Sequence, residues 1–253
     1  MNKVDRADAD ILLAFVLGCT RAQLALKPTP TPTQQTRYET LLARRTHGEP
    51  VAYLTGEKEF WSLTLKVTPD VLIPRPETEL LVEWALQFAP HRVADLGTGS
   101  GAIALALAKE LPQARIYATD ISDAALAVAK NNAEILALRN LEFLSGSFLE
   151  PLDGTLDVIV SNPPYVAEHD PHLPALRHEP VLALVSGVDG LDAIREITRR
   201  APDKLKAGGW LLLEHGAEQG AAVRELLKQA GFTRIETRRD LAGHERVSAG
   251  CRG

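Results

Sequence analysis

The sequence contains little cysteine, few aromatic residues and no excess of positive charge. Only two of its 253 residues are cysteines, Cys19 and Cys251, and their wide separation argues against a disulfide framework or a zinc site. Aromatic side chains make up 5% of the residues and the formal net charge is -5, so no global basic field attracts nucleic acid. The composition therefore favours a globular protein of a reducing compartment.

Long apolar runs are also missing. The apolar stretch from Ile11 to Leu17 is too short to span a bilayer, and the residues before it are polar and acidic. Apolar residues form 45% of the chain, and its length suffices for one large domain with a small one beside it. We therefore expect a cytoplasmic monomer that acts without a membrane and without direct binding to nucleic acid.

Helical spacing dominates the beginning of the chain. Apolar residues recur at helical intervals over residues 5–26, where Gly18 predicts a break between two short helices. Three alternate prolines predict an extended connection over 27–33, and a further helix is predicted over 34–46. Residues 1–50 are therefore predicted to form a small helical domain.

A strand pattern follows over residues 51–72. Leu63, Leu65 and Val67 alternate with polar residues at period two, which is typical of a strand with one buried face. We interpret this segment as a β-hairpin linker between the helical domain and the rest of the chain.

A proline-rich segment over residues 73–79 opens the remaining part of the chain. Thr78 or Glu77 is predicted to cap a helix over 80–88, because both side chains carry an acceptor oxygen next to its first turn. Residues 73–253 are predicted to form one large α/β domain.

Strand and helix patterns alternate within this domain. Such alternation predicts a doubly wound, mostly parallel sheet covered by helices on both faces. The last two of seven predicted strands lack room for a helix between them, so an antiparallel C-terminal hairpin is expected. The predicted strands span 93–96, 116–119, 141–144, 156–161, 210–214, 233–238 and 244–248, and the predicted helices 100–111, 122–138, 192–205 and 217–230.

A glycine-rich loop, Asp95-Leu-Gly-Thr-Gly-Ser-Gly101, lies between the first of these strands and its helix. Glycine lets the backbone approach a ligand there and turn its amides toward it. The pattern also fits the loose dinucleotide fingerprint, and a tight turn without a ligand is a further alternative. The candidate cofactor-binding residues in this loop are Gly97, Thr98, Gly99, Ser100 and Gly101.

Asp120 ends the next strand, roughly twenty residues beyond the loop, where an acid accepts hydrogen bonds from ribose hydroxyls. Its position favours a ligand that contains adenosine without deciding between a nicotinamide cofactor and S-adenosylmethionine. Capping of the helix that follows Ser122 is an alternative role that is compatible with the first.

A buried strand ends in Asn162-Pro163-Pro164-Tyr165, at the edge of the sheet where such folds bind ligands. The prolines lack an N–H and hold Asn162 extended, which leaves the Asn162 side-chain oxygen and the Pro163 carbonyl as two acceptors for one NH₂ group. The ring of Tyr165 is predicted to pack on a planar amide or base. An ordinary turn after a core strand is the alternative.

Two acceptors on one NH₂ group suit methyl transfer to a planar nitrogen. They aim the nitrogen lone pair at a sulfonium methyl, and they bind more tightly as the nitrogen becomes positive. A dehydrogenase has no use for such a pair. We therefore expect Asn162, Pro163 and Tyr165 to be catalytic, with S-adenosylmethionine as the methyl donor and no strong general base.

These motifs resemble the class I methyltransferases with an Asn-Pro-Pro-Tyr motif, and more closely the protein-(glutamine-N5) methyltransferases that modify class I peptide chain release factors. The resemblance spans nearly the whole chain, and the Pro-Arg-Pro-Glu-Thr-Glu run and the helical leader are its most specific parts. Further matching runs are Tyr53-Leu-Thr-Gly56, Glu59-Phe-Trp61, Leu72 to Glu79, Glu179-Pro180, Leu211 to Gly216 and Gly243 to Val247.

The resemblance implies a Rossmann-like methyltransferase domain over 73–253 and a substrate-recognition domain over 1–50. It also implies that the glycine loop and Asp120 hold S-adenosylmethionine, with Asn162 in contact, and that Phe148 lies against the adenine. Residues Asn162, Pro163, Pro164 and Tyr165 would then receive the glutamine of a Gly-Gly-Gln loop. The chain has Ser147 where the family usually has an acid, so the contact to the adenine amino group is weaker or comes from the backbone; Phe148 as a plain core residue is the alternative.

Two other acceptors keep the same cofactor. A glutamine of a ribosomal protein is one, and the N6 nitrogen of an adenine in nucleic acid is the other. The adenine hypothesis requires a basic, aromatic-rich region that extrudes the base, which the composition disfavours. A nucleotide-binding module without catalysis is a third hypothesis, and the intact Asn-Pro-Pro-Tyr run argues against it.

Several polar residues have no assigned role. The histidines His169, His172 and His178 lack neighbouring acids or cysteines at ligand spacing, so no metal is expected. Arg75 and Arg177 either meet the methionine carboxylate or substrate backbone, or form surface pairs. Glu214 with His215 lines the pocket or forms a turn before Gly216.

Overall fold

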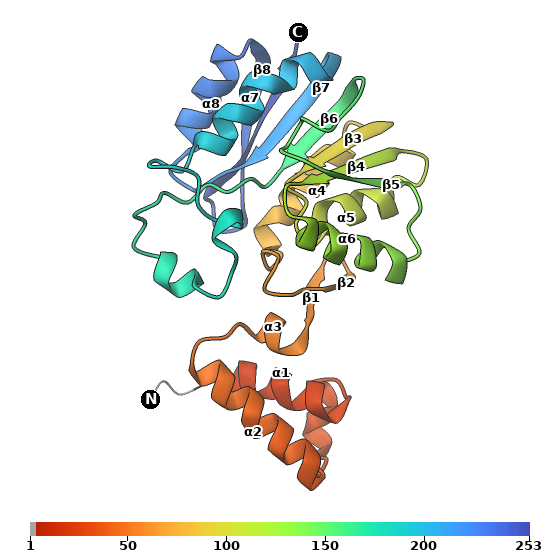
Figure 1. Ribbon diagram of the computed structural model, residues 1–253, viewed down its shortest axis with the longest axis vertical. Coiled ribbons are helices and arrows are strands. Elements are labelled where there is room, and N and C mark those ends of the chain that lie inside the picture. Colours follow the sequence, from red (N-terminus) through yellow and green to blue (C-terminus); the bar gives the residue numbers. More distant parts are fainter. Residues whose placement is uncertain (1–3) are drawn as a thin grey trace.

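The computed structural model describes residues 4–253. A small helical part near the N-terminus is joined through a short helix and a two-stranded hairpin to a larger α/β part (Figure 1). Across the described range, no helix combines the length and the apolar character needed to cross a membrane.

The larger part is built on a seven-stranded sheet of order β5-β4-β3-β6-β7-β9-β8. Strands β5, β4, β3, β6 and β7 run parallel, whereas β9 runs antiparallel to both β7 and β8. This topology confirms the predicted doubly wound fold with its antiparallel C-terminal hairpin. The strands are β3 (Arg92–Leu96), β4 (Arg115–Asp120), β5 (Leu141–Ser145), β6 (Leu156–Ser161), β7 (Leu205–Glu214), β8 (Phe232–Arg239) and β9 (Glu245–Arg252).

Helices cover both faces of this sheet because its central strands are apolar on both sides. In β6, Val158 and Val160 belong to the core cluster beneath α4 and α5, whereas Ile159 belongs to the cluster beneath α7 and α8. Figure 1 shows α6 on the same side as α4 and α5. The helices are α4 (Glu79–Leu86), α5 (Ala102–Glu110), α6 (Asp123–Ile135), α7 (Asp192–Lys204) and α8 (Gly220–Gln229).

Leu12, Val16, Leu41 and Leu54 form the core of the N-terminal part. The two short helices predicted over residues 5–26 are confirmed, with Gly18 as the left-handed C-cap of the first at φ 65°. The elements of this part are α1 (Arg6–Leu17), a 3₁₀ helix η1 (Ala22–Leu26) and α2 (Pro32–Thr46), and the linker helix α3 (Val51–Thr55) contributes Leu54 to their core.

Helix α2 begins two residues before the predicted Gln34. The Thr31 hydroxyl accepts the Gln34 backbone N–H, and the Gln34 side chain accepts the Thr31 backbone N–H, which completes a capping box. Pro32 occupies the first helical position, where its missing N–H costs no hydrogen bond. Pro32, the last of the three prolines, therefore begins α2, so the extended connection predicted over 27–33 ends before it.

The linker contains the predicted hairpin and also α3, which is too short to show a helical periodicity in the sequence. Its strands are β1 (Glu57–Phe60) and β2 (Leu63–Lys66), joined by Trp61 and Ser62 at φ 52° and 54°. Phe60 is packed in the core of the larger part, whereas Leu54 of α3 is packed in the N-terminal core. The linker thus contributes side chains to both cores.

The predicted capping of α4 by Thr78 or Glu77 is wrong. A 3₁₀ turn η2 (Pro76–Thr78) leads directly into α4, and Thr78 has helical backbone angles without a side-chain cap bond. Because its hydroxyl accepts no backbone N–H of α4, that hydroxyl is available for another partner.

Candidate active site

A cavity of about 400 Å³ lies at the carboxyl ends of β3, β4, β5 and β6. Its volume falls in the range of roughly 300–1,000 Å³ that small-molecule sites occupy. Six of the candidate site residues line it: Gly97, Gly99, Asp120, Phe148, Asn162 and Pro164. Because these residues follow four different strands, the parallel sheet itself brings them together.

The glycine loop forms one wall of this cavity. The backbone N–H groups of Gly97 and Thr98 donate to the Thr119 carbonyl at 2.8 and 2.9 Å, which ties the loop to β4. Gly97 has φ 69°, a conformation that glycine adopts without strain. Thr98 and Ser100 are buried, and neither they nor Gly101 line the cavity.

Asp120 fixes the loop from the neighbouring strand. One carboxylate oxygen accepts the Gly99 N–H at 2.9 Å and the other accepts the Ser122 N–H at 2.9 Å. Each oxygen keeps a second acceptor position, and the side chain lines the cavity. The cap of α6 is Ser122, which accepts the Ala125 N–H, so the alternative of Asp120 as that cap is wrong.

Asp95 lies buried beneath the loop. Its Oδ2 accepts the Thr98 hydroxyl at 2.7 Å and the Ala104 N–H at 3.2 Å, while its Oδ1 has no hydrogen-bond partner within residues 4–253. Burial raises the pKa of Asp95 to about 7, against the lowering effect of these two bonds. Asp95 therefore fixes the conformation of the glycine loop from the buried side, through Thr98 and the first turn of α5.

Phe148 is both a wall of the cavity and a core residue. Its ring packs against the core cluster under α7, and Cε1 would lie 3.9 Å from a Cβ placed on Gly97. The Thr119 hydroxyl donates to its carbonyl at 2.8 Å and holds the backbone at φ 44°. The adjacent Ser147 also lines the cavity, and the predicted contact of Phe148 with the adenine stays a prediction.

Asn162 follows β6 directly and lines the same cavity. The preceding Ser161 donates to the Leu96 carbonyl at 2.7 Å, which fixes the end of the strand. The Asn162 Nδ2 donates to the Thr78 hydroxyl at 3.2 Å, so the Oδ1 of the same amide faces away from Thr78. Pro164 lines the cavity, whereas Pro163 is buried.

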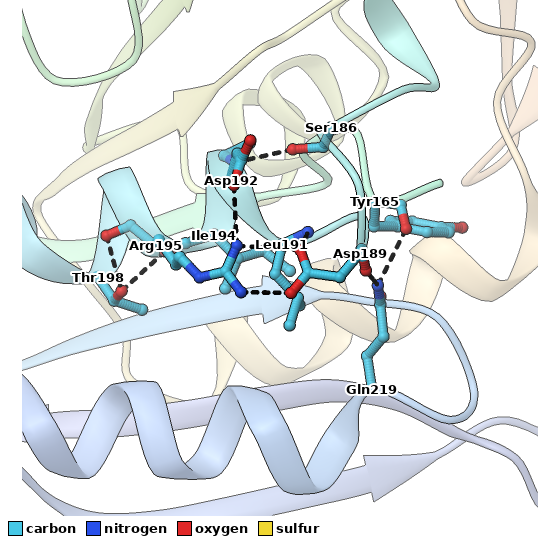
Figure 2. A network of polar contacts seen from close by, with 10 residues as sticks. Tyr165, Ser186, Asp189, Leu191, Asp192, Ile194, Arg195, Thr198 and Gln219 are labelled. Atoms are coloured by element: carbon cyan, nitrogen blue, oxygen red, sulfur yellow. Dashed lines mark hydrogen bonds and ion pairs between the residues drawn. The ribbon is translucent and has the colours of Figure 1, made fainter. Parts of the chain in front are cut away.

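Tyr165 does not line the cavity. Its ring packs against the core cluster under α7, and its hydroxyl donates to the buried Glu214 at 3.4 Å. Its carbonyl accepts the Gln219 Nε2 at 3.0 Å, and the same nitrogen donates to the Asp189 carbonyl at 3.3 Å, as Figure 2 shows. Tyr165 is therefore held at both ends, and the structure does not bring its ring to the expected contact with an acceptor.

Glu214 at the end of β7 is the buried acid behind Asn162 and Tyr165. Burial raises its pKa to about 7, although Thr78, Arg246 and Tyr165 each lower it. Its Oε2 accepts no hydrogen bond of good geometry in the part of the chain that the structure describes. The sequence shows the acid at a strand end, but nothing in the sequence joins it to Thr78.

Arg75 and Arg177 form intramolecular contacts. Arg75 pairs with the buried Glu179, whose other oxygen accepts the Ile73 N–H at 3.1 Å. Arg177 donates to the His47 carbonyl at the end of α2. The segment between β6 and α7 is thus tied to the proline-rich segment 73–79 and to the helical part.

The remaining walls were not predicted. They come from residues 70–72 of the linker, residues 180–186 and the first turns of α7. Asn132 of α6 is a further missed residue, since its Nδ2 donates to the Ser100 and Lys66 carbonyls at 2.9 Å and joins the glycine loop to β2. Between residues 4 and 253, no group of three or more His, Cys, Asp or Glu side chains has a geometry that could hold a metal.

Two family models match the chain. The model of the methyltransferase small domain matches residues 76–178, which contain the glycine loop, Asp120 and the Asn-Pro-Pro-Tyr run. The model of the PrmC N-terminal domain matches residues 3–56, which contain α1, α2 and α3.

Curated relatives match over the full length. The release factor glutamine methyltransferase of Coxiella burnetii is 48% identical over 260 aligned positions, which cover 100% of this chain and 94% of the relative. The enzyme of the same name from Xylella fastidiosa is 50% identical, with 100% and 95% covered. A crystal structure of a methyltransferase from Pyrococcus furiosus shares the fold with a TM-score of 0.61 and 19% identity, over 83% of this chain and 97% of that one.

Proposed function

Because the chain belongs to the release factor glutamine methyltransferase family, as its motifs predict, we propose that it methylates a release factor glutamine. The methyl donor is S-adenosylmethionine, and the acceptor is the side-chain N5 of the glutamine in the Gly-Gly-Gln loop of class I peptide chain release factors. The observation that carries this proposal is that the glycine loop and Asn162, which follow the neighbouring strands β3 and β6, line one cavity. A methyl donor and a planar amide are thereby held side by side.

The residues of the cavity fit the cofactor. Gly97 and Gly99 expose backbone without side chains, and Asp120 retains free acceptor positions for ribose hydroxyls. Phe148 supplies an aromatic face for the adenine, and Ser147 beside it leaves the adenine amino group to backbone or to a weaker side-chain contact. Thr98, Ser100 and Gly101 keep the loop in shape from behind.

S-adenosylmethionine supplies an electrophilic methyl group on its sulfonium. The task of the protein is then to hold the glutamine nitrogen and to stabilise the charge that develops on it. The Asn162 Oδ1, which faces away from Thr78, accepts one N–H, and the Pro163 carbonyl accepts the other. Both bonds strengthen as the nitrogen becomes positive, so they favour the transition state over bound substrate.

Tyr165 contributes in a different way from the expected stacking. With its hydroxyl on Glu214 and its carbonyl on Gln219, it holds the diproline corner rigid from the core side. We therefore assign the grip on the amide to Asn162 and Pro163, and the support of their geometry to Pro164 and Tyr165.

We assign a separate role to each of the three parts of the chain. Residues 1–50 recognise the release factor, residues 51–72 link and residues 73–253 carry the methyl transfer. The contact of Arg177 with the His47 carbonyl supports this division, because it holds the helical part beside the segment that forms the cavity wall. We further propose that the enzyme acts as a cytoplasmic monomer without direct binding to nucleic acid.

Radiolabelled S-adenosylmethionine tests the acceptor. The purified protein is incubated separately with release factor, with release factor whose loop glutamine is replaced by alanine, with a ribosomal protein fraction and with DNA. We expect label in intact release factor alone. Label in DNA or in the ribosomal fraction, with none in release factor, would reject the assigned substrate.

A further inference from the structure

Two polar side chains from distant parts of the chain, Thr78 and Glu214, lie behind Asn162. Its Nδ2 donates to the Thr78 hydroxyl at 3.2 Å, and the two residues are 84 positions apart. The Thr78 hydroxyl also lies close enough to the buried Glu214 carboxyl to lower the pKa of that group. The two side chains do not form a hydrogen bond of full geometry, and Glu214 Oε2 has no partner among the described residues.

The direction of these contacts follows from the number of protons. A carboxylate only accepts, so an ionised Glu214 favours the orientation in which Thr78 points its single hydroxyl proton toward Glu214. The oxygen of Thr78 then presents lone pairs to Asn162 and can be met only by the NH₂ end of the Asn162 amide. The Oδ1 end must therefore face the cavity, where the substrate NH₂ needs an acceptor.

We propose that Thr78 and Glu214 are positioning residues that fix which end of the Asn162 amide faces the acceptor substrate. This inference rests on the proposed function, since it names the groups that aim the grip on the glutamine nitrogen. We call the contacts from Glu214 through Thr78 to Asn162 the relay. The two ends of the Asn162 amide are nearly equal in shape, so without the relay the amide can flip. A flipped Asn162 presents its NH₂ group to the NH₂ group of the substrate, and both groups are donors. Neither Thr78 nor Glu214 is among the residues that line the cavity.

The relay depends on the charge of Glu214. Besides Thr78 and Tyr165, the charged groups that act on it are Arg246 of β9, which favours the carboxylate, and Glu77 of η2, which opposes it. Burial outweighs them and raises the pKa of Glu214 to about 7. A protonated Glu214 can donate to Thr78, which then turns its own proton toward Asn162 and favours the flipped amide. Turnover is therefore expected to rise as Glu214 ionises.

Two threonine variants test the role of the hydroxyl. Thr78→Val keeps the shape and removes the acceptor of Asn162, whereas Thr78→Ser keeps the hydroxyl. Thr198→Val is the matched control, because Thr198 is a buried threonine on α7 whose hydroxyl donates to the Ile194 carbonyl away from the cavity. We expect kcat to fall about 10- to 100-fold in Thr78→Val with the cofactor Kd unchanged, as misoriented catalytic groups do. Thr78→Ser is expected to recover most of the loss.

Glu214→Gln tests the charge, because the glutamine oxygen can accept the Thr78 proton at every pH. At saturating cofactor, the kcat of the parent enzyme should rise between pH 6 and pH 8, on the order of tenfold over this range. The variant should lack that rise. Saturation removes any contribution of Asp95 through cofactor binding, since burial raises the pKa of Asp95 to about 7 as well.

An NMR measurement separates this inference from the proposed substrate. The side-chain NH₂ resonances of Asn162, read in protein without substrate, should move in Thr78→Val and stay in Thr198→Val. Unchanged resonances in Thr78→Val, an unchanged kcat in that variant, or equal pH profiles for the parent and Glu214→Gln would each overturn the relay. A parent enzyme that methylates no release factor would instead refute the proposed function, and the NMR result alone would then decide the relay.

Discussion

Three glycine-to-alanine substitutions should separate the role of the glycine loop in binding from its role in folding. Gly97 and Gly101 both lie in the left-handed region, at φ 69° and 85°. A Cβ on Gly97 would find only Phe148 Cε1 at 3.9 Å, and the residue lines the cavity. A Cβ on Gly101 would meet Leu105 at 3.0 Å and Ala129 at 3.2 Å in the packed interior. The two substitutions therefore disturb opposite sides of the same loop.

The expected losses of unfolding free energy follow from these distances. A left-handed alanine costs roughly 1–2 kcal/mol, and overpacking adds roughly 1–3 kcal/mol at Gly101 alone. For a chain of this length, 1 kcal/mol lowers Tm by roughly 2–4 °C. Gly97→Ala should therefore lower Tm by roughly 2–8 °C, and Gly101→Ala by roughly 4–20 °C. Gly18→Ala, at φ 65° with no atom within 4 Å, gives the strain alone in the helical part.

Cofactor binding should follow the opposite order. Gly97 is part of the cavity wall, and the added methyl group of Gly97→Ala should reduce the space for the cofactor. The Kd for S-adenosylmethionine should therefore rise at least tenfold, about 1.4 kcal/mol. Folded Gly101→Ala should bind within about threefold of the parent, because its methyl group points into the core. Calorimetric titration and thermal melts measure both quantities on the same samples. If both variants lost stability and affinity in the same proportion, the assignment of the two sides of the loop would be refuted.

Three further substitutions have simple outcomes. Asn162→Ala should lower kcat more than about 100-fold while the cofactor Kd changes by less than about tenfold, as single-turnover and binding assays can show; retained turnover would remove Asn162 from the mechanism. Ser62→Gly should raise the unfolding free energy by about 1 kcal/mol in urea titrations, because Ser62 sits at φ 54° in the hairpin turn. Burial raises the pKa of Glu214 from 4.5 to about 7, so the folded protein keeps a proton that the unfolded chain releases. The parent should therefore lose stability relative to Glu214→Gln as pH rises from about 4.5 to about 7, whereas parallel stability curves would contradict this sign.

The sheet and its order of elements could be predicted because the signal is local and repeated. Each strand of the parallel sheet is a short apolar run between helices with an apolar face, and the strand β6 matches its predicted range of 156–161 in full. Strand β7 begins at Leu205, five residues before the predicted Trp210. Its additional residues include Gly208 and Gly209, which weaken a strand pattern without preventing a strand.

The site could be predicted only where one short run carries both the fold and the chemistry. Gly97, Asp120 and Asn162 follow strands directly, so the parallel sheet places them at one edge. The ring of Tyr165 does not line the cavity as expected, because the sequence gives its neighbours along the chain but not the direction of its side chain. Glu214 and Gln219 hold it toward the core.

Thr78 shows why the remaining part of the site could not be predicted. Its local sequence predicts a helix cap, since a threonine before an apolar helical run often serves as one. In the structure the Thr78 side chain instead accepts the Asn162 amide and lies near Glu214, and both residues are remote from it in the sequence. Such contacts exist only after the proline-rich segment 73–79 has packed against the sheet, and no pattern within that segment encodes them.

The linker and the proline-rich segment 73–79 that follows it therefore form part of the candidate active site as well as a connection. Phe60 anchors the linker in the main core, and the buried Glu179 holds the proline-rich segment through the Ile73 N–H and the Arg75 side chain. Thr78 follows within the same rigid proline-rich run and reaches Asn162. The segment that carries Glu179 also carries Arg177, which contacts the C-terminus of α2. Because one continuous set of contacts runs from the helical part to Asn162, the position of that part should bear on the proposed grip of Asn162 on the substrate as well as on the proposed recognition of the release factor.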